Sequence, residues 1–120
     1  MVKRDCKVYA KDILDNMQMA EDFLKNISFE KLLEDRKTAY AVIRCIEIIG
    51  EAVKHMPDYI RKKYPKIPWK MMAGMRDKVI HEYFGIALEV VWKTVKEEIP
   101  VLKPLMKNIF AELKCGMNKD

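Results

Sequence analysis

Apolar residues recur along this chain at the three- and four-residue spacing of helices that bury one face. The first stripe predicts a helix over about residues 5–27 and consists of Cys6, Ile13, Met17, Ala20, Leu24 and Ile27. The second stripe predicts a helix over about residues 35–56 and consists of Ala39, Val42, Ile46, Ile49 and Val53. Between the two, Ser28 is a candidate N-cap for a short helical turn in the segment SFEKLLED.

Prolines divide the third quarter of the chain. Pro57 either ends the second helix or starts a short one over PDYIRKKY. Pro68 is well placed as the first residue of a helix over about residues 68–84, and Gly85 is a candidate for the residue that closes it.

A last helix is predicted over about residues 87–114. Pro100 and Pro104 fall inside it, so a kink or a break is expected near residues 99–103. Its apolar face consists of Val91, Val95, Leu102, Met106, Ile109 and Leu113. No β-type alternation bounded by hairpin turns is present, so the pattern predicts an all-α, up-and-down bundle of four main helices plus short ones. At 120 residues the chain suits a single domain over 1–120.

Composition excludes several classes of protein. With 50% apolar and 34% charged residues the chain is neither disordered nor membrane-embedded. The N-terminus has no apolar segment of a secretory signal, and no window approaches the roughly 18 apolar residues of a membrane span. Cys6, Cys45 and Cys115 lack the spacing of a metal site, which favours a reducing, cytoplasmic location. No metal or cofactor is predicted, because no phosphate-binding glycine loop or dinucleotide fingerprint occurs.

The net charge of +5 comes entirely from the segment 57–80, since the segments on either side are each neutral. Asp58 and Asp77 are the acidic residues of this segment. Its basic residues are Arg61, Lys62, Lys63, Lys66, Lys70, Arg76 and Lys78. The aromatic residues among them are Tyr59, Tyr64 and Trp69. This pattern is typical of a surface that binds a polyanion such as RNA, although a solvated turn explains the charge equally well.

Arg76 and His81 are the candidate catalytic pair, in the segment RDKVIHEY. Arginine is a permanent cation whose planar fork matches phosphate oxygens, and histidine is suited to proton transfer near neutral pH. Together they suffice for metal-independent cleavage of RNA: the histidine removes the proton of a ribose 2′-OH, which attacks the adjacent phosphorus while the arginine stabilises the developing charge. The products are a 2′,3′-cyclic phosphate and a 5′-OH end.

The spacing complicates this assignment. Five residues along a helix rotate the side chain by about 140°, so Arg76 and His81 do not share a face. Asp77 and His81 are four apart and can form an orienting pair. A complete site therefore needs a long reach by Arg76, a distorted helix end, or two copies of the chain around one cleft. The alternative is a structural Arg–Asp–His cluster at a helix end.

Two carboxylates in the second helix are further candidates. Glu51 can hold Arg76 from a neighbouring helix, or it can belong with Glu47 to an exposed ladder of ion pairs on one helix face. Gly50 lies in mid-helix at a cost of about 1 kcal/mol relative to alanine, which a close helix crossing would explain. His55 is interpreted as a cation at the helix C-terminus.

The segment IPWKMMAGMRDKVIHEYFGI resembles the HepT-like branch of the HEPN ribonuclease superfamily. The resemblance extends upstream through RKTAYAVIRCIEIIGEAVK and downstream through LEVVWKTVKEEIPVLK, so it covers roughly residues 5–110. It departs at Ala87, where the family often has an Asp that caps the last helix.

The resemblance implies an α-helical homodimer that brings two Arg-x4-His motifs to a shared cleft and cleaves RNA without a metal. It implies Arg76 and His81 as the catalytic residues, with Asp77 in the polar position after the arginine. It also implies a toxin whose partner is a minimal nucleotidyltransferase (MNT) antitoxin, which silences it by transferring AMP to Tyr83. The alternative function is a non-catalytic helical module that binds the nucleotidyltransferase or a nucleotide.

Overall fold

The computed structural model describes residues 5–116, and their side chains up to residue 113. The elements in chain order are α1 (Cys6–Leu24), α2 (Phe29–Glu34), α3 (Arg36–Lys54), α4 (Asp58–Lys63), α5 (Trp69–His81), α6 (Phe84–Lys93), the π-helical turn η1 (Thr94–Glu98) and α7 (Ile99–Gly116). This part of the chain contains helices and no strand, which confirms the predicted all-α bundle.

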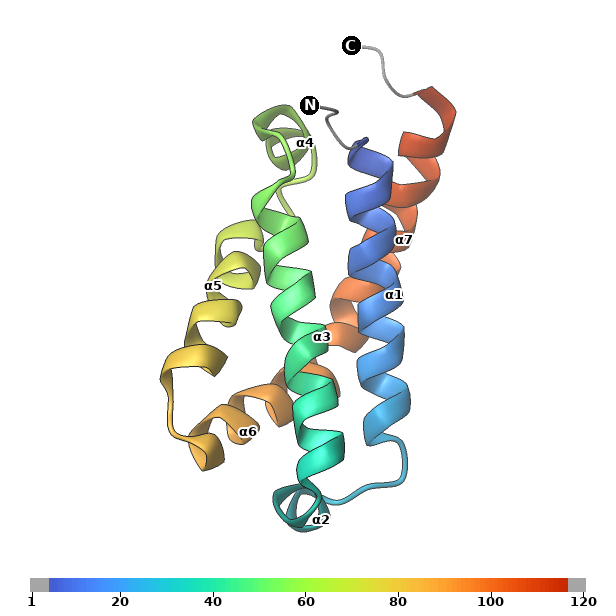
Figure 1. Ribbon diagram of the computed structural model, residues 1–120. Coiled ribbons are helices and arrows are strands. Elements are labelled where there is room, and N and C mark those ends of the chain that lie inside the picture. Colours follow the sequence, from blue (N-terminus) through green and yellow to red (C-terminus); the bar gives the residue numbers. More distant parts are fainter. Residues whose placement is uncertain (1–4, 117–120) are drawn as a thin grey trace.

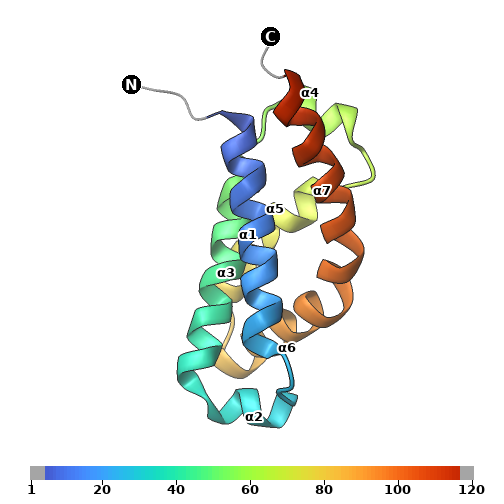
Figure 2. The same cartoon turned by 90° about the vertical axis from the view of Figure 1, so that its right-hand side faces the viewer.

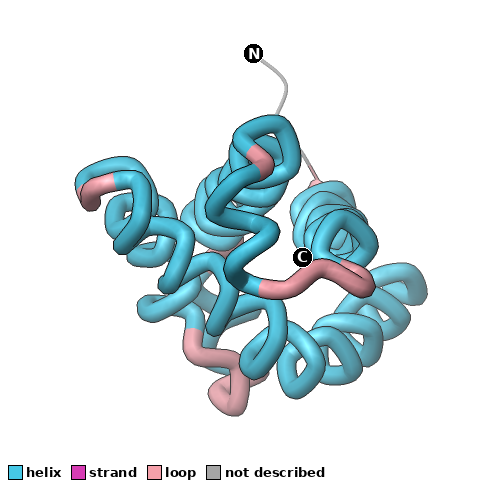
Figure 3. The backbone as a smooth tube through the Cα atoms, turned by 90° about the horizontal axis from the view of Figure 1, so that it is seen from below, coloured by secondary structure: helices cyan, strands magenta, loops and turns pink. Residues whose placement is uncertain are grey.

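The helices form an elongated bundle of 47 × 26 × 25 Å. The long helices α1 and α3 run antiparallel, α5 packs on the other side of α3, and α7 packs against α1 (Figures 1 and 2). The short helices α2 and α4 lie at opposite ends of the bundle, and α6 crosses behind the lower half of α3 to connect α5 with η1 and α7 (Figure 1). Seen from below, the loops are confined to short connections between helices (Figure 3).

The predicted apolar stripes form the core. Every member of the α3 stripe is buried, as are the central members of the α1 and α7 stripes. Cys6, Ile27 and Leu113, at the outer ends of the stripes, are only partly buried. Burying these stripes against one another removes apolar surface from water, which is the main source of stability for such a bundle.

Side chains that accept hydrogen bonds from free backbone N–H groups mark the helix starts. Asp5 caps α1, Ser28 caps α2 as predicted, and Asp35 caps α3. The first helix ends at Leu24, three residues earlier than predicted, because Lys25 is extended and Asn26 adopts a left-handed φ of 62°. A left-handed residue cannot continue a right-handed helix.

The predicted boundary between the last two helices was wrong. The helix predicted over 68–84 ends at His81, and Gly85 lies inside the first turn of α6 instead of closing α5. Ala87 is buried within α6, so it does not stand at the start of a helix. The position N-terminal to α6 belongs to Tyr83, whose side chain makes no capping bond.

The predicted break near residues 99–103 lies slightly earlier. Pro100 has no N–H to bond the carbonyl of Lys96, and the chain responds with the wider π-helical turn over Thr94–Glu98, in which the Ile99 N–H donates to the Thr94 carbonyl. Pro104 is accommodated inside α7. The fourth predicted helix is therefore two segments, α6 and α7, that run in different directions (Figure 1).

Candidate active site

Arg76 lies where α5 crosses α3 at close range. A Cβ atom placed on Gly50 would lie 2.9 Å from the Cβ of Arg76 and 3.4 Å from the carbonyl oxygens of Met72 and Ala73. Real Cβ atoms do not approach other atoms to 2.9 Å, so this crossing requires glycine on α3. The crossing predicted from Gly50 is confirmed, and it sets Arg76 beside the residue that follows Gly50.

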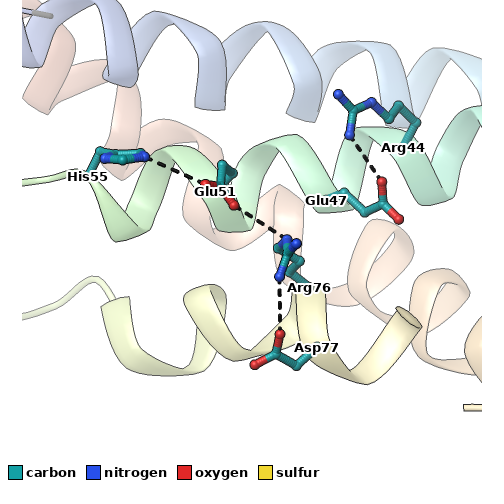
Figure 4. A network of polar contacts seen from close by, with 6 residues as sticks. All are labelled: Arg44, Glu47, Glu51, His55, Arg76 and Asp77. Carbon is teal, nitrogen blue, oxygen red and sulfur yellow. Dashed lines mark hydrogen bonds and ion pairs between the residues drawn. The ribbon is translucent and has the colours of Figure 1, made fainter. Parts of the chain in front are cut away.

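That residue is Glu51, whose carboxylate lies between a guanidinium and an imidazole. Its Oε1 lies 3.4 Å from Nε of Arg76, and its Oε2 lies 3.6 Å from Nε2 of His55 (Figure 4). Glu47 points away from this group and pairs with Arg44 at 3.1 Å (Figure 4). Glu51 therefore holds Arg76 from the neighbouring helix, which is one of the two interpretations of these carboxylates. Glu47 forms an ion pair on its own helix face, which is the other.

Asp77 completes the surroundings of Arg76. Its Oδ1 accepts a hydrogen bond from Nη1 of Arg76 at 3.3 Å. The guanidinium thus has a carboxylate on each of two sides and remains about one-third exposed. The expected orienting pair between the Asp77 carboxylate and His81 is not formed.

His81 is the last residue of α5, and its Nδ1 lies 2.9 Å from the backbone carbonyl oxygen of Asp77. A carbonyl oxygen only accepts hydrogen bonds, so this contact requires the proton on Nδ1. In the neutral ring Nε2 then carries the free lone pair, as a general base needs. The side chain is exposed to solvent.

Arg76 and His81 both belong to α5, which is regular α-helix from Trp69 to His81. The helix therefore separates them by about 140° around its axis. A distorted helix end, one of the three ways expected to unite them, is absent from α5. A long reach by Arg76 and a second copy of the chain remain.

Tyr83 lies in the two-residue connection between α5 and α6 and is 83% exposed. The helix predicted over 68–84 includes Tyr83, which was wrong because α5 has already ended at His81. The backbone of Tyr83 is extended, with φ −59° and ψ 151°, and its carbonyl accepts from the N–H of Ala87 at 2.8 Å. The ring is open to any partner that approaches this corner.

Among the basic residues of the segment 57–80, Arg61 binds the backbone while the lysines are exposed to solvent. Arg61 donates to the carbonyl oxygens of Val53, Lys54 and Met56 at 3.0–3.2 Å, so its guanidinium satisfies the C-terminal end of α3. The predicted RNA contact of Arg61 therefore competes with a structural role. Five lysines remain exposed, namely Lys62, Lys63, Lys66, Lys70 and Lys78.

The aromatic residues of this segment are mostly structural. Trp69 is buried and donates through Nε1 to the Tyr64 carbonyl at 3.0 Å. The Tyr64 hydroxyl donates to Glu112 on α7, and burial together with this bond raises the pKa of Tyr64 to about 12. Tyr59 is exposed and lies near the thiol of Cys6.

A cleft of about 540 Å³ opens beside Arg76. Its walls come from α1, α3 and α5, and the lining residues include Tyr9, Asp12, Arg44, Glu47, Glu51, His55 and Arg76. Tyr9 stacks on His55, with ring centroids 5.2 Å apart and planes inclined by 13°. The sequence pattern did not identify Tyr9 or Asp12, because no periodicity links them to the motif. The i, i+4 spacing of Glu51 and His55 was the only sequence feature that indicated a contact in this part of the site.

Residues 5–116 contain neither a cluster of metal ligands nor a candidate membrane-spanning helix. No three His, Cys, Asp or Glu side chains in this range gather as metal ligands would. None of the helices within it combines the length and the apolar character that crossing a membrane requires.

Comparison with known proteins places the chain in one family. Residues 13–109 match the family described as "Ribonuclease HepT-like". Among similar proteins are "Putative RNase MJ1216" of Methanocaldococcus jannaschii, 47% identical over 95% of this chain and 94% of that protein, and "Probable ribonuclease HepT" of Thermococcus cleftensis, 52% identical over 85% and 93%. "Putative RNase TTE0752" of Caldanaerobacter subterraneus is 44% identical over 88% and 95%. No solved structure gives a significant match. With its helical bundle and a family match that spans the motif of Arg76 and His81, the chain belongs to the HepT-like ribonuclease family.

Proposed function

We propose that the protein is a metal-independent endoribonuclease. The observation that carries the proposal is the pair formed by a partly exposed Arg76, held by Glu51 and Asp77, and a His81 whose Nδ1–H is bonded to a carbonyl. The first supplies a fixed cation for a phosphate, and the second supplies a base at Nε2.

The reaction follows from these groups. Nε2 of His81 takes the proton of a ribose 2′-OH, and the 2′-oxygen forms a bond to the adjacent phosphorus. Arg76 stabilises the charge on the phosphoryl oxygens. The bond from phosphorus to the 5′-oxygen breaks, and a protonated histidine of a second motif returns a proton to the leaving oxygen. The products are a 2′,3′-cyclic phosphate and a 5′-OH end.

A homodimer would complete this site. The 140° offset between Arg76 and His81 on a regular α5 supports two chains around one cleft. Exposed apolar side chains on α5 and α6 also support an interface there, namely Met71, Ile80 and Ile86. Light scattering at micromolar concentration should give twice the chain mass, and an active monomer would contradict this part of the proposal.

The biological role we propose is that of a toxin in a two-gene module with an MNT-type nucleotidyltransferase antitoxin. The partner would attach AMP to Tyr83, whose high exposure suits modification by another enzyme. The Tyr83 hydroxyl attacks the α-phosphorus of Mg-bound ATP, and pyrophosphate leaves as the proton passes to a base of the partner. The added phosphate and adenosine would then obstruct RNA at the adjacent His81.

Cleavage of RNA in the presence of EDTA tests the function. Wild type should cleave RNA and leave DNA intact, since DNA lacks the 2′-OH. His81→Ala should abolish cleavage with unchanged helical content, and Arg76→Lys should fail because lysine lacks the bidentate fork. Full activity in His81→Ala would remove His81 from the mechanism. No cleavage by wild type would favour the non-catalytic module that binds the nucleotidyltransferase or a nucleotide, which the exposure of Tyr83 would also serve.

A further inference from the structure

The cleft beside Arg76 has the dimensions of a ligand site. Its volume of about 540 Å³ falls in the range of roughly 300–1,000 Å³ that small-molecule sites occupy. It lies along α3, with His55 at one end, Arg44 toward the other, and the contact of Glu51 with Arg76 between them (Figure 4). A group bound at Arg76 is therefore at the edge of this cleft.

One end of the cleft is a stack of two rings. Tyr9 covers one face of His55, and the His55 side chain is nevertheless 53% exposed. Tyr9 belongs to α1 and His55 is the C-cap residue of α3, and these two helices pack against each other, so the stack is held by the bundle itself. An exposed ring such as His55 is the kind of platform on which unpaired nucleobases stack.

Charges of both signs line the cleft. Three carboxylates line it, those of Asp12, Glu47 and Glu51, against the cations Arg44 and Arg76. Arg44 is paired with Glu47 and Arg76 with Glu51. The exposed lysines of α4 and α5 offer the cations for a phosphate backbone, and the cleft offers the space for a planar base.

We infer that this cleft binds the unpaired nucleobase of the nucleotide next to the scissile phosphate, stacked on His55. The inference rests on the proposed ribonuclease function, which sets the phosphate at Arg76. His55 is then a residue that positions the RNA for cleavage.

Binding of a short single-stranded RNA tests this inference, in a His81→Ala background that prevents turnover. A series of oligonucleotides with one abasic nucleotide, moved stepwise along the strand, locates the position whose base contributes to affinity. Removal of that base should weaken binding roughly 5- to 100-fold, as loss of one base stack does. His55→Ala should weaken binding of the intact strand to a similar extent. In this variant, the intact strand and the strand that lacks that base should bind with equal affinity.

His55→Phe separates stacking from the contact with Glu51. Phenylalanine keeps an aromatic face but cannot pair with the carboxylate, so it should retain most of the affinity and the abasic effect. Tyr40→Ala is the matched control, an exposed aromatic residue of α3 outside the cleft, and should bind like the parent.

Two results would overturn the inference and leave the proposed ribonuclease function standing. In the first, no abasic position weakens binding in a way that depends on His55. In the second, the His55→Phe variant binds RNA as weakly as the His55→Ala variant. Failure of the proposed function looks different. Wild type would then neither bind nor cut RNA, whatever occupies position 55.

Discussion

The Glu51 carboxylate and the Arg76 guanidinium meet across the crossing of α3 and α5, with Oε1 and Nε 3.4 Å apart. Gly50 permits the contact, because its missing side chain lets the backbone of α5 approach α3. The orientation of the arginine in the motif thus depends on two consecutive residues of another helix, one that permits the approach and one that binds.

Gly50→Ala should destabilise the protein by about 1–3 kcal/mol, because the new methyl group would lie 2.9 Å from the Cβ of Arg76 and must push the helices apart. The free energy of unfolding in urea measures the effect. RNA cleavage should fall as well, since Arg76 would shift with α5.

Gly74→Ala is the matched control, because nothing lies within 4 Å of a Cβ at that position in the middle of α5. It should stabilise the protein by about 0.5–1 kcal/mol through the better helix propensity of alanine. Equal stability of the two variants would show that the helices do not cross as closely as described.

Glu51→Gln should lower kcat for RNA cleavage about tenfold, since the amide holds the guanidinium less firmly than a carboxylate does. The free energy of unfolding should change little, because Glu51 is 54% exposed and exposed ion pairs contribute little to stability. Asp15→Asn removes an exposed ion pair with Lys11 on α1, outside the cleft, and should keep wild-type kcat. A similar loss in both variants would point to a general electrostatic effect.

Replacing Lys62, Lys63 and Lys66 together by glutamine should weaken RNA binding and flatten its salt dependence. If each lysine contacts one phosphate of a single strand, the slope of log K against log salt should decrease by about 2 in magnitude. Replacing three exposed lysines elsewhere, Lys25, Lys37 and Lys93, provides the comparison and should leave the slope nearly unchanged.

Tyr83→Phe should prevent attachment of AMP while preserving RNA cleavage, because only the hydroxyl is lost. Intact-mass spectrometry after incubation with ATP, Mg²⁺ and the cognate nucleotidyltransferase should show an adduct on wild type and on Tyr40→Phe, another exposed tyrosine. Persistence of the adduct in Tyr83→Phe would move the modification to a different residue.

Asp35→Ala should lower the melting temperature at pH 7 more than at pH 3. Asp35 accepts hydrogen bonds from the backbone N–H and the hydroxyl of Thr38, and these bonds lower the pKa of its carboxyl group. A lowered pKa in the folded state means that the ionised cap stabilises the fold above the unfolded pKa of about 4, and that this stabilisation is lost as the pH falls through the folded pKa. Ser28→Ala removes a cap that does not titrate, so its effect should be nearly independent of pH.

The sequence alone was sufficient for the helical architecture, the core stripes and the residues of the motif. These features depend on spacing within one helix, where a period of 3.6 residues fixes which side chains share a face. The α3 stripe and the N-cap at Ser28 are of this kind, and both were predicted correctly. Helix ends were less well predicted: the candidate stop at Gly85 is the start of α6, because a single glycine is compatible with either position.

Only the tertiary structure decided which side chains meet from different helices. Glu51 had two possible roles on sequence grounds, and the close crossing at Gly50 selected the contact with Arg76. Arg61 had the charge of an RNA contact, but the path of the chain after α3 brings it to the free carbonyls of that helix. The stack of Tyr9 on His55 joins residues 46 positions apart. Periodicity carries no information on such contacts, because they depend on the angle and the register at which two helices pack, and many side chains together set that packing.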